Sequence, residues 1–131
     1  MSANGQIAVS EQIAGTVDAP RIARDAAAHL LGRLGCGVER ADDVALIISE
    51  LVTNAVVHGP GGRDVTLRMT GTAHLIRIEV SDEGTAPFHW PGDRLDGHHG
   101  LGLVRAFADR SGFMFRPWTV AWCELDLDGA R

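Results

Sequence analysis

Apolar residues in the first third of the chain change from a loose alternation to the spacing of an amphipathic helix. Residues 6–14 contain several β-branched side chains and predict a short strand, although apolar and polar residues do not alternate strictly. Asp18 stands where a helix N-cap is expected, and Pro20 falls in the first turn, where proline is tolerated. Apolar residues then recur three and four positions apart up to Gly35, a residue type that commonly ends helices. The pattern predicts a strand followed by a helix.

A second helix and a β-hairpin are predicted in the middle of the chain. Helical spacing of apolar residues begins near residue 41 or 42 and ends at the Gly-Pro-Gly-Gly sequence of residues 59–62. The apolar period then changes to two on either side of a turn at residues 71–72, which is typical of a hairpin. The alternating residues are Val65, Leu67 and Met69, then Ile76, Ile78 and Val80.

The last third begins with a long stretch that has no periodic apolar pattern. Residues 82–100 include six Gly or Pro residues, and a segment of this length without regular structure is usually functional. A third helix is predicted from Leu101 to about residue 111, and two strands, at about 113–117 and 119–127, follow. This order favours an α+β two-layer sandwich, with helices on one face of a mixed, mostly antiparallel sheet. We expect one domain over residues 1–131, with its core at about 16–127.

Composition narrows the functional classes. A net charge of −5 argues against a nucleic-acid-binding protein, and no apolar run approaches the roughly 18 residues of a membrane span. The N-terminus also lacks a signal-peptide pattern, so a cytoplasmic location is expected. All 12 basic residues are Arg, which excludes a P-loop and Schiff-base chemistry, since both need Lys. Cys36 and Cys123 match no metal-site spacing and are interpreted as packing thiols.

One stripe of the second helix carries candidate chemistry. Glu50, Asn54 and His58 follow each other at intervals of four, so they share one side of the helix, at the border of its apolar face. A carboxylate one turn before a carboxamide places a base beside an oxygen ligand for Mg²⁺. A solvated helix face that ends in a histidine would show the same residues.

Two further motifs follow the hairpin. Ser81-Asp82-Glu83-Gly84 comes directly after an apolar strand, where Asp can accept a hydrogen bond from a ligand amine, although this is also a common turn sequence. Residues 97–103, Gly-His-His-Gly-Leu-Gly-Leu, open the third helix and suit phosphate groups, although a flexible loop and a helix cap would also explain them. His98 and His99 are adjacent without an evident third ligand, which disfavours a metal site.

Together the three motifs resemble those of the GHKL (Bergerat-fold) ATPase and kinase superfamily. Residues 50–59, Glu-Leu-Val-Thr-Asn-Ala-Val-Val-His-Gly, look like its N box; residues 81–84 look like its adenine-recognising box; and residues 100–103 look like its second glycine box. In its short length and in the residue sequence of its N box, the chain is most similar to the bacterial anti-sigma-factor serine/threonine kinases.

The resemblance implies ATP and Mg²⁺ as cofactors and gives each motif residue a role. Glu50 would be the general base, and Asn54 would ligate Mg²⁺. Asp82 would accept a hydrogen bond from the adenine amine, and Gly84 would leave room for the base. The phosphates would lie against the backbone of the second glycine box, and the ATP lid would be residues 85–99. The residues of that box are Gly100, Leu101 and Gly102, with His99 or Arg105 as further candidates.

The chain departs from the family pattern at three positions. His98 stands where histidine kinases have a glycine, and Ala86 where a second glycine often follows Gly84. If Trp122 matches the family's Trp, Val120 fills the position of a family Thr, and Thr119 lies one residue away. A one-residue step changes the face of a strand, so Thr119 is not assigned to adenine.

The expected function is that of a protein serine/threonine kinase that binds a sigma factor and phosphorylates a serine of an anti-anti-sigma partner. Two other functions stay open: a nucleotide-binding partner switch without kinase activity, and a sensor that hydrolyses ATP slowly. Intact Glu50 favours catalysis, and the altered glycine and threonine positions favour the binding module. We expect no contact with nucleic acid or a membrane, and the sequence leaves homodimer formation open.

Overall fold

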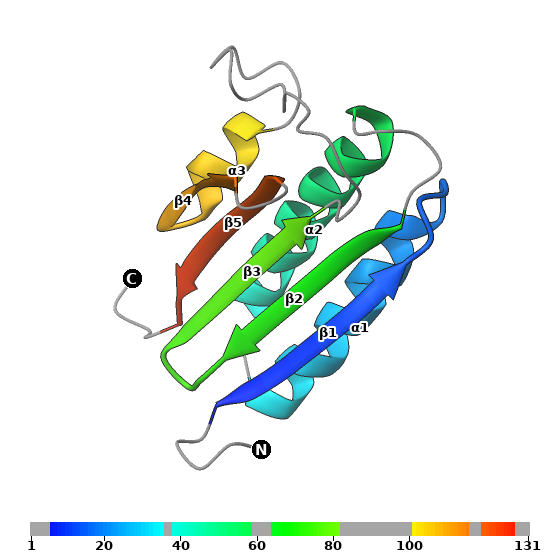
Figure 1. Ribbon diagram of the computed structural model, residues 1–131. Coiled ribbons are helices and arrows are strands. Elements are labelled where there is room, and N and C mark those ends of the chain that lie inside the picture. Colours follow the sequence, from blue (N-terminus) through cyan, green and yellow to red (C-terminus); the bar gives the residue numbers. More distant parts are fainter. Residues whose placement is uncertain (1–5, 36–37, 59–63, 82–100, 116–118, 128–131) are drawn as a thin grey trace.

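The computed structural model describes residues 6–35, 38–58, 64–81, 101–115 and 119–127. Three helices and five strands lie within them, in the order expected from the apolar pattern (Figure 1). The elements are β1 (Ile7–Ile13), α1 (Ala19–Leu34), α2 (Val38–His58), β2 (Val65–Gly71), β3 (Leu75–Ser81), α3 (Leu101–Phe107), β4 (Arg110–Phe115) and β5 (Thr119–Asp126).

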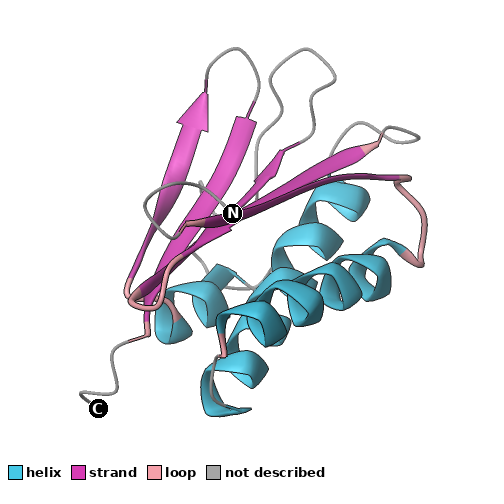
Figure 2. Ribbon diagram, turned by 90° about the horizontal axis from the view of Figure 1, so that it is seen from below, coloured by secondary structure: helices cyan, strands magenta, loops and turns pink. Residues whose placement is uncertain are grey.

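The five strands form one sheet, and the helices lie together on one of its faces (Figures 1 and 2). The strand order is β1-β2-β3-β5-β4, and each described pair is antiparallel. This arrangement confirms the predicted α+β two-layer sandwich. It leaves β1 and β4 at the edges of the sheet and places α2 over its middle strands.

The core lies between the helices and the sheet, where the predicted alternation faces α1 and α2. Side chains of β2, β3 and β5 on this face are fully or almost fully buried, as are those of the apolar stripe of α2. Burial of side chains of this size is the main driving force for folding, at about 1.5–3 kcal/mol for each large aliphatic residue. The strand residues concerned are Leu67, Met69, Ile76, Ile78, Val80, Ala121, Cys123 and Leu125.

Helix α1 begins and ends where the sequence predicted, but its N-terminus is built differently. Asp18 precedes the helix with φ −84° and ψ −8°, and its side chain makes no capping hydrogen bond. Its own N–H donates to Thr16 Oγ1 at 3.3 Å. Gly35 ends the helix with φ +70°, a left-handed conformation that glycine adopts at little cost, so the predicted stop is confirmed.

Three predicted boundaries were wrong. Helix α2 begins at Val38 instead of residue 41 or 42, α3 ends at Phe107 instead of residue 111, and β4 begins at Arg110 instead of residue 113. The early start of β4 follows from polar contacts, since Arg110 donates to Glu124 Oε1 at 2.8 Å and also pairs with Asp126 on β5. Apolar periodicity carries no information about such pairs.

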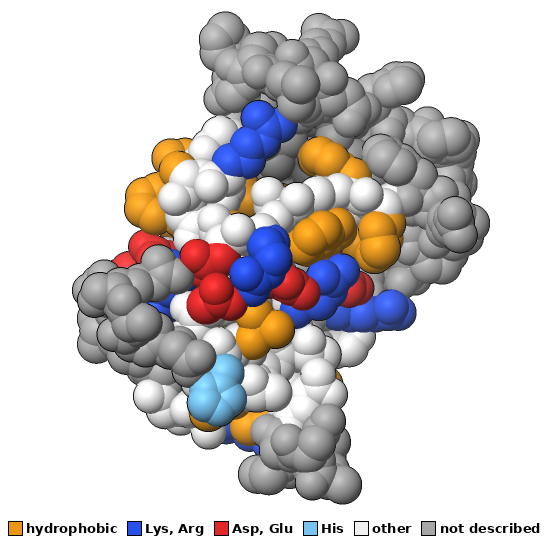
Figure 3. Space-filling view, turned by 90° about the vertical axis from the view of Figure 1, so that its left-hand side faces the viewer, with side chains coloured by type: hydrophobic (Ala, Val, Ile, Leu, Met, Phe, Trp, Pro, Cys, Tyr) orange, Lys and Arg blue, Asp and Glu red, His pale blue; other side chains and the backbone are white. Residues whose placement is uncertain are grey.

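The face of the sheet away from the helices carries paired charges. Arg77 on β3 donates to Glu79 at 2.8 Å and to Glu124 on β5 at 3.0 Å, and its guanidinium lies 4.6 Å from the centroid of the Trp122 ring. The hydrogen bond from Arg110, followed by that from Arg77, holds the pKa of Glu124 below its usual value. A band of charged side chains crosses the side of the molecule seen in Figure 3. Among the described helices, none is long and apolar enough to cross a membrane.

Candidate functional site

The described parts of the three motifs lie toward one end of the fold. The C-terminal half of α2, the end of β3, the start of α3 and the start of β5 all lie toward the upper end of the molecule in Figure 1. Ser81, the last residue of β3, pairs with Val120 near the start of β5, and α3 packs against α2. The described parts of the three motifs, residues 50–58, Ser81 and residues 101–103, therefore border the same region.

Asn54 is the most informative of the described site residues. Its side chain is only 2% exposed, in a helix face otherwise formed by apolar residues such as Leu51 and Ala55. Its Nδ2 donates a hydrogen bond of 2.7 Å to the backbone carbonyl of Glu50. With the amide nitrogen turned to the helix, the atom left for a ligand is the Oδ1 oxygen. A carboxamide oxygen held in this way fits the oxygen coordination that Mg²⁺ requires.

Glu50 lies one helical turn before Asn54 and is partly buried. Because residues four apart in a helix share one side, Glu50 and Asn54 lie on the same side of α2, and Asn54 Nδ2 bonds to the Glu50 carbonyl. The preceding residue, Ser49, accepts a hydrogen bond of 2.9 Å from Arg24 on α1 and donates one of 2.9 Å to the carbonyl of Ala45. Neighbouring groups of α1 and α2 therefore fix this stretch of helix.

The start of β5 carries the position that would match the family's threonine. Val120 pairs with Ser81 of β3 and Met114 of β4, whereas the next residue, Ala121, joins the core between sheet and helices. Because sides alternate along a strand, Val120 lies on the face away from the helices. The position aligned with the family's threonine is therefore not on the helix-facing surface of β5.

Several predicted site residues lie outside the described residues. They are Asp82 and Gly84 of the adenine-recognising motif, Gly100 of the glycine motif, His98 and His99, and the predicted lid at 85–99. Leu101 and Gly102 form the first two positions of α3, and Gly102 is partly buried. The structure describes the residues that border this segment in sequence. Ser81, at the end of β3, precedes it, and Leu101, at the start of α3, follows it.

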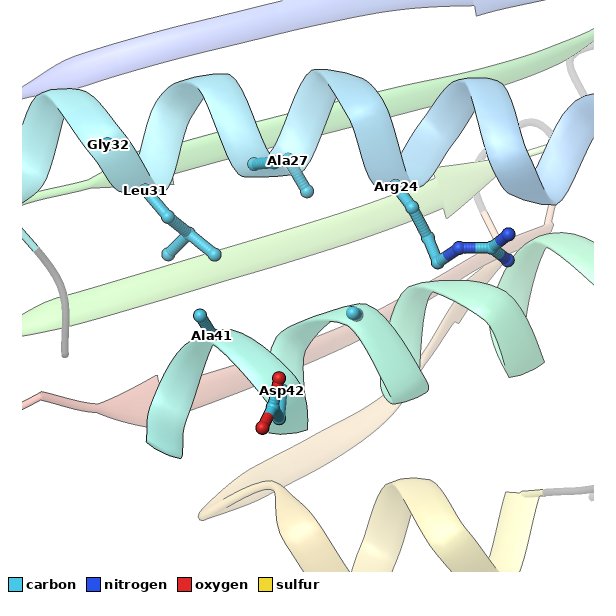
Figure 4. A pocket seen from close by; sticks show the side chains of 8 residues that line it. Arg24, Ala27, Leu31, Gly32, Ala41 and Asp42 are labelled. Carbon is cyan, nitrogen blue, oxygen red and sulfur yellow. The ribbon is translucent and has the colours of Figure 1, made fainter. Parts of the chain in front are cut away.

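A cavity of about 340 Å³ lies elsewhere, between the outer sides of α1 and α2 (Figure 4). Small side chains such as Ala27 and Ala41 line it, with Arg24 and Asp42 at its rim. None of the predicted site residues lines it. Within the described ranges, no group of three His, Cys, Asp or Glu side chains could hold a metal ion.

One polar cluster was missed by sequence reasoning. Arg40, in the first turn of α2, donates hydrogen bonds to four groups on α2, α3, β5 and the segment between α3 and β4. An arginine near a helix start has no distinctive spacing, so the sequence offered no signal for it.

Comparison with known proteins gives a family and a fold. The family model described as "Histidine kinase-like ATPase domain" matches residues 13–113. The fold is similar to a solved structure of the RsbU and RsbW domains of Rv1364c from Mycobacterium tuberculosis, with a TM-score of 0.72 and 22% sequence identity. That match covers 92% of this chain and 32% of the mycobacterial chain, so this chain spans about a third of its length. No protein with a curated description matches significantly.

Proposed function

The chain belongs to the family of histidine kinase-like ATPase domains, and from this premise we propose that it binds ATP with Mg²⁺ at the end of the fold described above. The observation that carries the proposal is Asn54, a buried carboxamide with its nitrogen bonded to the Glu50 carbonyl. Among the described residues Oδ1 has no hydrogen-bond partner, and an unpaired buried polar atom costs about 1–3 kcal/mol, so we propose that a ligand is its partner. A cation bound between this oxygen and a triphosphate is such a ligand.

In the proposed site, each of the three motifs binds a different part of Mg-ATP. Asp82, directly after β3, would accept a hydrogen bond from the adenine amine, with Gly84 giving the base room. The phosphates would lie near the start of α3, at Gly100, Leu101 and Gly102. Because the chain has no Lys, charge compensation there would come from Mg²⁺, backbone N–H groups and the Arg105 or His99 side chain.

We further propose that the protein is a serine/threonine kinase. Glu50 would accept the proton of a partner's serine hydroxyl while the serine oxygen bonds to the γ-phosphorus. The bond from that phosphorus to the bridging oxygen breaks, and ADP leaves. Phosphoryl transfer depends mainly on positioning and electrostatics, so one base and one metal ligand on adjacent turns of α2 suffice.

The partners we propose are a sigma factor and an anti-anti-sigma protein, and the location we propose is the cytoplasm. The N box is similar to that of anti-sigma-factor kinases, and the similar mycobacterial structure contains an RsbW domain. A partner switch without kinase activity is the second candidate. The departures at the two glycine positions, His98 and Ala86, favour it, since these positions belong to the segments proposed to surround the nucleotide, while Asn54 is retained.

A substitution of Glu50 distinguishes the kinase from the partner switch without kinase activity. Loss of a general base lowers the rate of transfer by about 10²- to 10⁴-fold, whereas nucleotide binding rests on other residues. We therefore expect Glu50→Gln to bind Mg-ATP with nearly wild-type affinity in calorimetry and to leave a cognate anti-anti-sigma protein unlabelled by radioactive ATP. Equal labelling by both proteins would remove Glu50 from the mechanism. Tight Mg-ATP binding by the wild type, without labelling of several candidate partner proteins, would favour the non-catalytic switch.

A further inference from the structure

Arg40 connects four parts of the fold through one guanidinium group. Its Nη1 donates to Asp43 Oδ2 at 2.8 Å, within α2, and to the carbonyl of Phe107 at 3.4 Å, at the end of α3. Its Nη2 donates to Asp109 Oδ2 at 2.8 Å, between α3 and β4, and its Nε to the carbonyl of Asp126 at 3.2 Å, at the end of β5. The side chain is only 15% exposed, so solvent screens these contacts weakly.

Helix α3 is short and has little buried surface among its described residues. It is seven residues long, and of its described side chains, those of residues 102–107, Val104 alone is buried. Leu103 and Phe107 are 39% and 37% exposed. A helix of two turns gains little stability from its own hydrogen bonds, so tertiary contacts at its ends decide where it lies. Arg40 supplies such a contact at the C-terminal end, where a cation is also favoured by the helix dipole.

Asp109 extends the connection to the sheet. Besides accepting from Arg40, its Oδ2 accepts a hydrogen bond of 2.7 Å from the N–H of Asp126, and its own N–H donates to the carbonyl of Glu124 at 2.9 Å. The turn from α3 into β4 is thus bound to β5 and, through Arg40, to the start of α2. Helix α2 is the element that carries Glu50 and Asn54.

We propose that Arg40 is a positioning residue that sets α3 relative to α2, and thereby the affinity for Mg-ATP at the far ends of both helices. The inference rests on the proposed function, because that function places the phosphates near the start of α3 and the cation at Asn54 of α2. Arg is required because its planar group donates in several directions at once, whereas a Lys ammonium could not reach all three neighbouring elements.

Arg40→Ala tests the proposal, and Asp43→Ala is its matched control. Both variants lose the 2.8 Å pair within α2, but only Arg40→Ala loses the bonds to Phe107, Asp109 and Asp126. Asp109→Asn provides a milder second variant should Arg40→Ala fail to fold. Calorimetry with Mg-ATP is run well below each melting temperature, where all variants are folded and a loss of stability alone leaves the measured affinity unchanged. Hydrogen exchange of the α3 amides is measured on the same samples without nucleotide.

We expect Arg40→Ala to weaken Mg-ATP binding by roughly fivefold to thirtyfold, the upper part of the range typical of mutations that alter coupling between sites, and Asp43→Ala to change it less than about twofold. The α3 amides should exchange faster in Arg40→Ala, and those of α1 should not. Equal affinities of the two variants, or unchanged exchange in α3, would overturn the role of Arg40. Failure of the wild type to bind Mg-ATP, with faster α3 exchange in Arg40→Ala, would instead refute the proposed function and leave Arg40 as a residue that only stabilises α3.

Discussion

Asn54 and Arg40 differ in how far the sequence could predict them. Asn54 belongs to a stripe of residues four apart on an apolar helix, so its place beside Glu50 follows from helical periodicity. Arg40 bonds to residues 67 and 69 positions away as well as to Asp43, and these partners depend on the whole fold. Local spacing therefore predicts a site within one element and gives no signal for one that joins several.

The role of Asn54 as the metal ligand is tested by Asn54→Ala. We expect the variant to lose the part of its ATP affinity that depends on Mg²⁺, because the amide oxygen is removed. Its stability should change by no more than about 1 kcal/mol, since Ala is the better helix former and Glu50 keeps its backbone hydrogen bond. Calorimetry with Mg²⁺ and with EDTA measures this, and Thr53→Ala, an exposed neighbour, is the control. An Asn54→Ala protein that responds to Mg²⁺ like the wild type would place the ion elsewhere.

Because Cys123 is buried, we expect the free energy of unfolding to fall as the pH rises into the alkaline range. Burial raises the pKa of this thiol to about 12, so the folded protein keeps its proton while the unfolded chain loses it near pH 9. The unfolded state then binds fewer protons, and the free energy of unfolding falls by up to about 1.4 kcal/mol per pH unit between these values. Urea unfolding at pH 8 and pH 10 should therefore show a larger loss for the wild type than for Cys123→Ala. Parallel losses in both proteins would contradict this role of Cys123.

At the scale of elements, the helix and strand types were predictable and the junctions were not. The predicted third helix continued to residue 111 because only Ser111 and Gly112 gave a stop signal. In the structure, Asp109 and Arg110 leave the helix for contacts with β5, at Glu124 and Asp126. Partners distant in sequence override local propensity at such boundaries.

Gly32 within α1 and Gly35 directly after it give opposite predictions for the same substitution. Gly35→Ala forces Ala into φ +70°, so we expect a loss of about 1 kcal/mol of stability. Gly32→Ala lies within the helix, where an added Cβ meets nothing within 4 Å, and should gain up to about 1 kcal/mol. Thermal unfolding of both variants beside the wild type measures the difference. A destabilised Gly32→Ala protein or an unaffected Gly35→Ala protein would contradict the end of α1 as described.

At the scale of the whole molecule, the sheet connects the core to the candidate site. Strict alternation along β2 and β3 predicted one buried face, and the helical stripes predicted what covers it. The pairing of β5 between β3 and β4 was not predictable, because strand order depends on contacts that no short sequence pattern encodes. This order brings the start of β5 beside the end of β3, directly before Asp82.

The predicted single domain and its proposed ligand can both be tested by unfolding the protein in urea. One continuous core joins β1, α1, α2, the middle strands and Val104 of α3, so urea should unfold the chain in one cooperative transition.

A ligand that binds only the folded state stabilises it by mass action, by about 2.7 kcal/mol at a hundredfold excess over Kd. Mg-ATP should therefore raise the urea midpoint and leave the m-value unchanged, because the surface exposed on unfolding stays the same. Circular dichroism follows the transition, and Mg²⁺ with adenosine, which lacks the phosphates, is the control. Two separate transitions would refute the single domain. A midpoint shifted equally by adenosine and ATP would show that the phosphates add nothing to binding, which the proposed role of Asn54 does not allow.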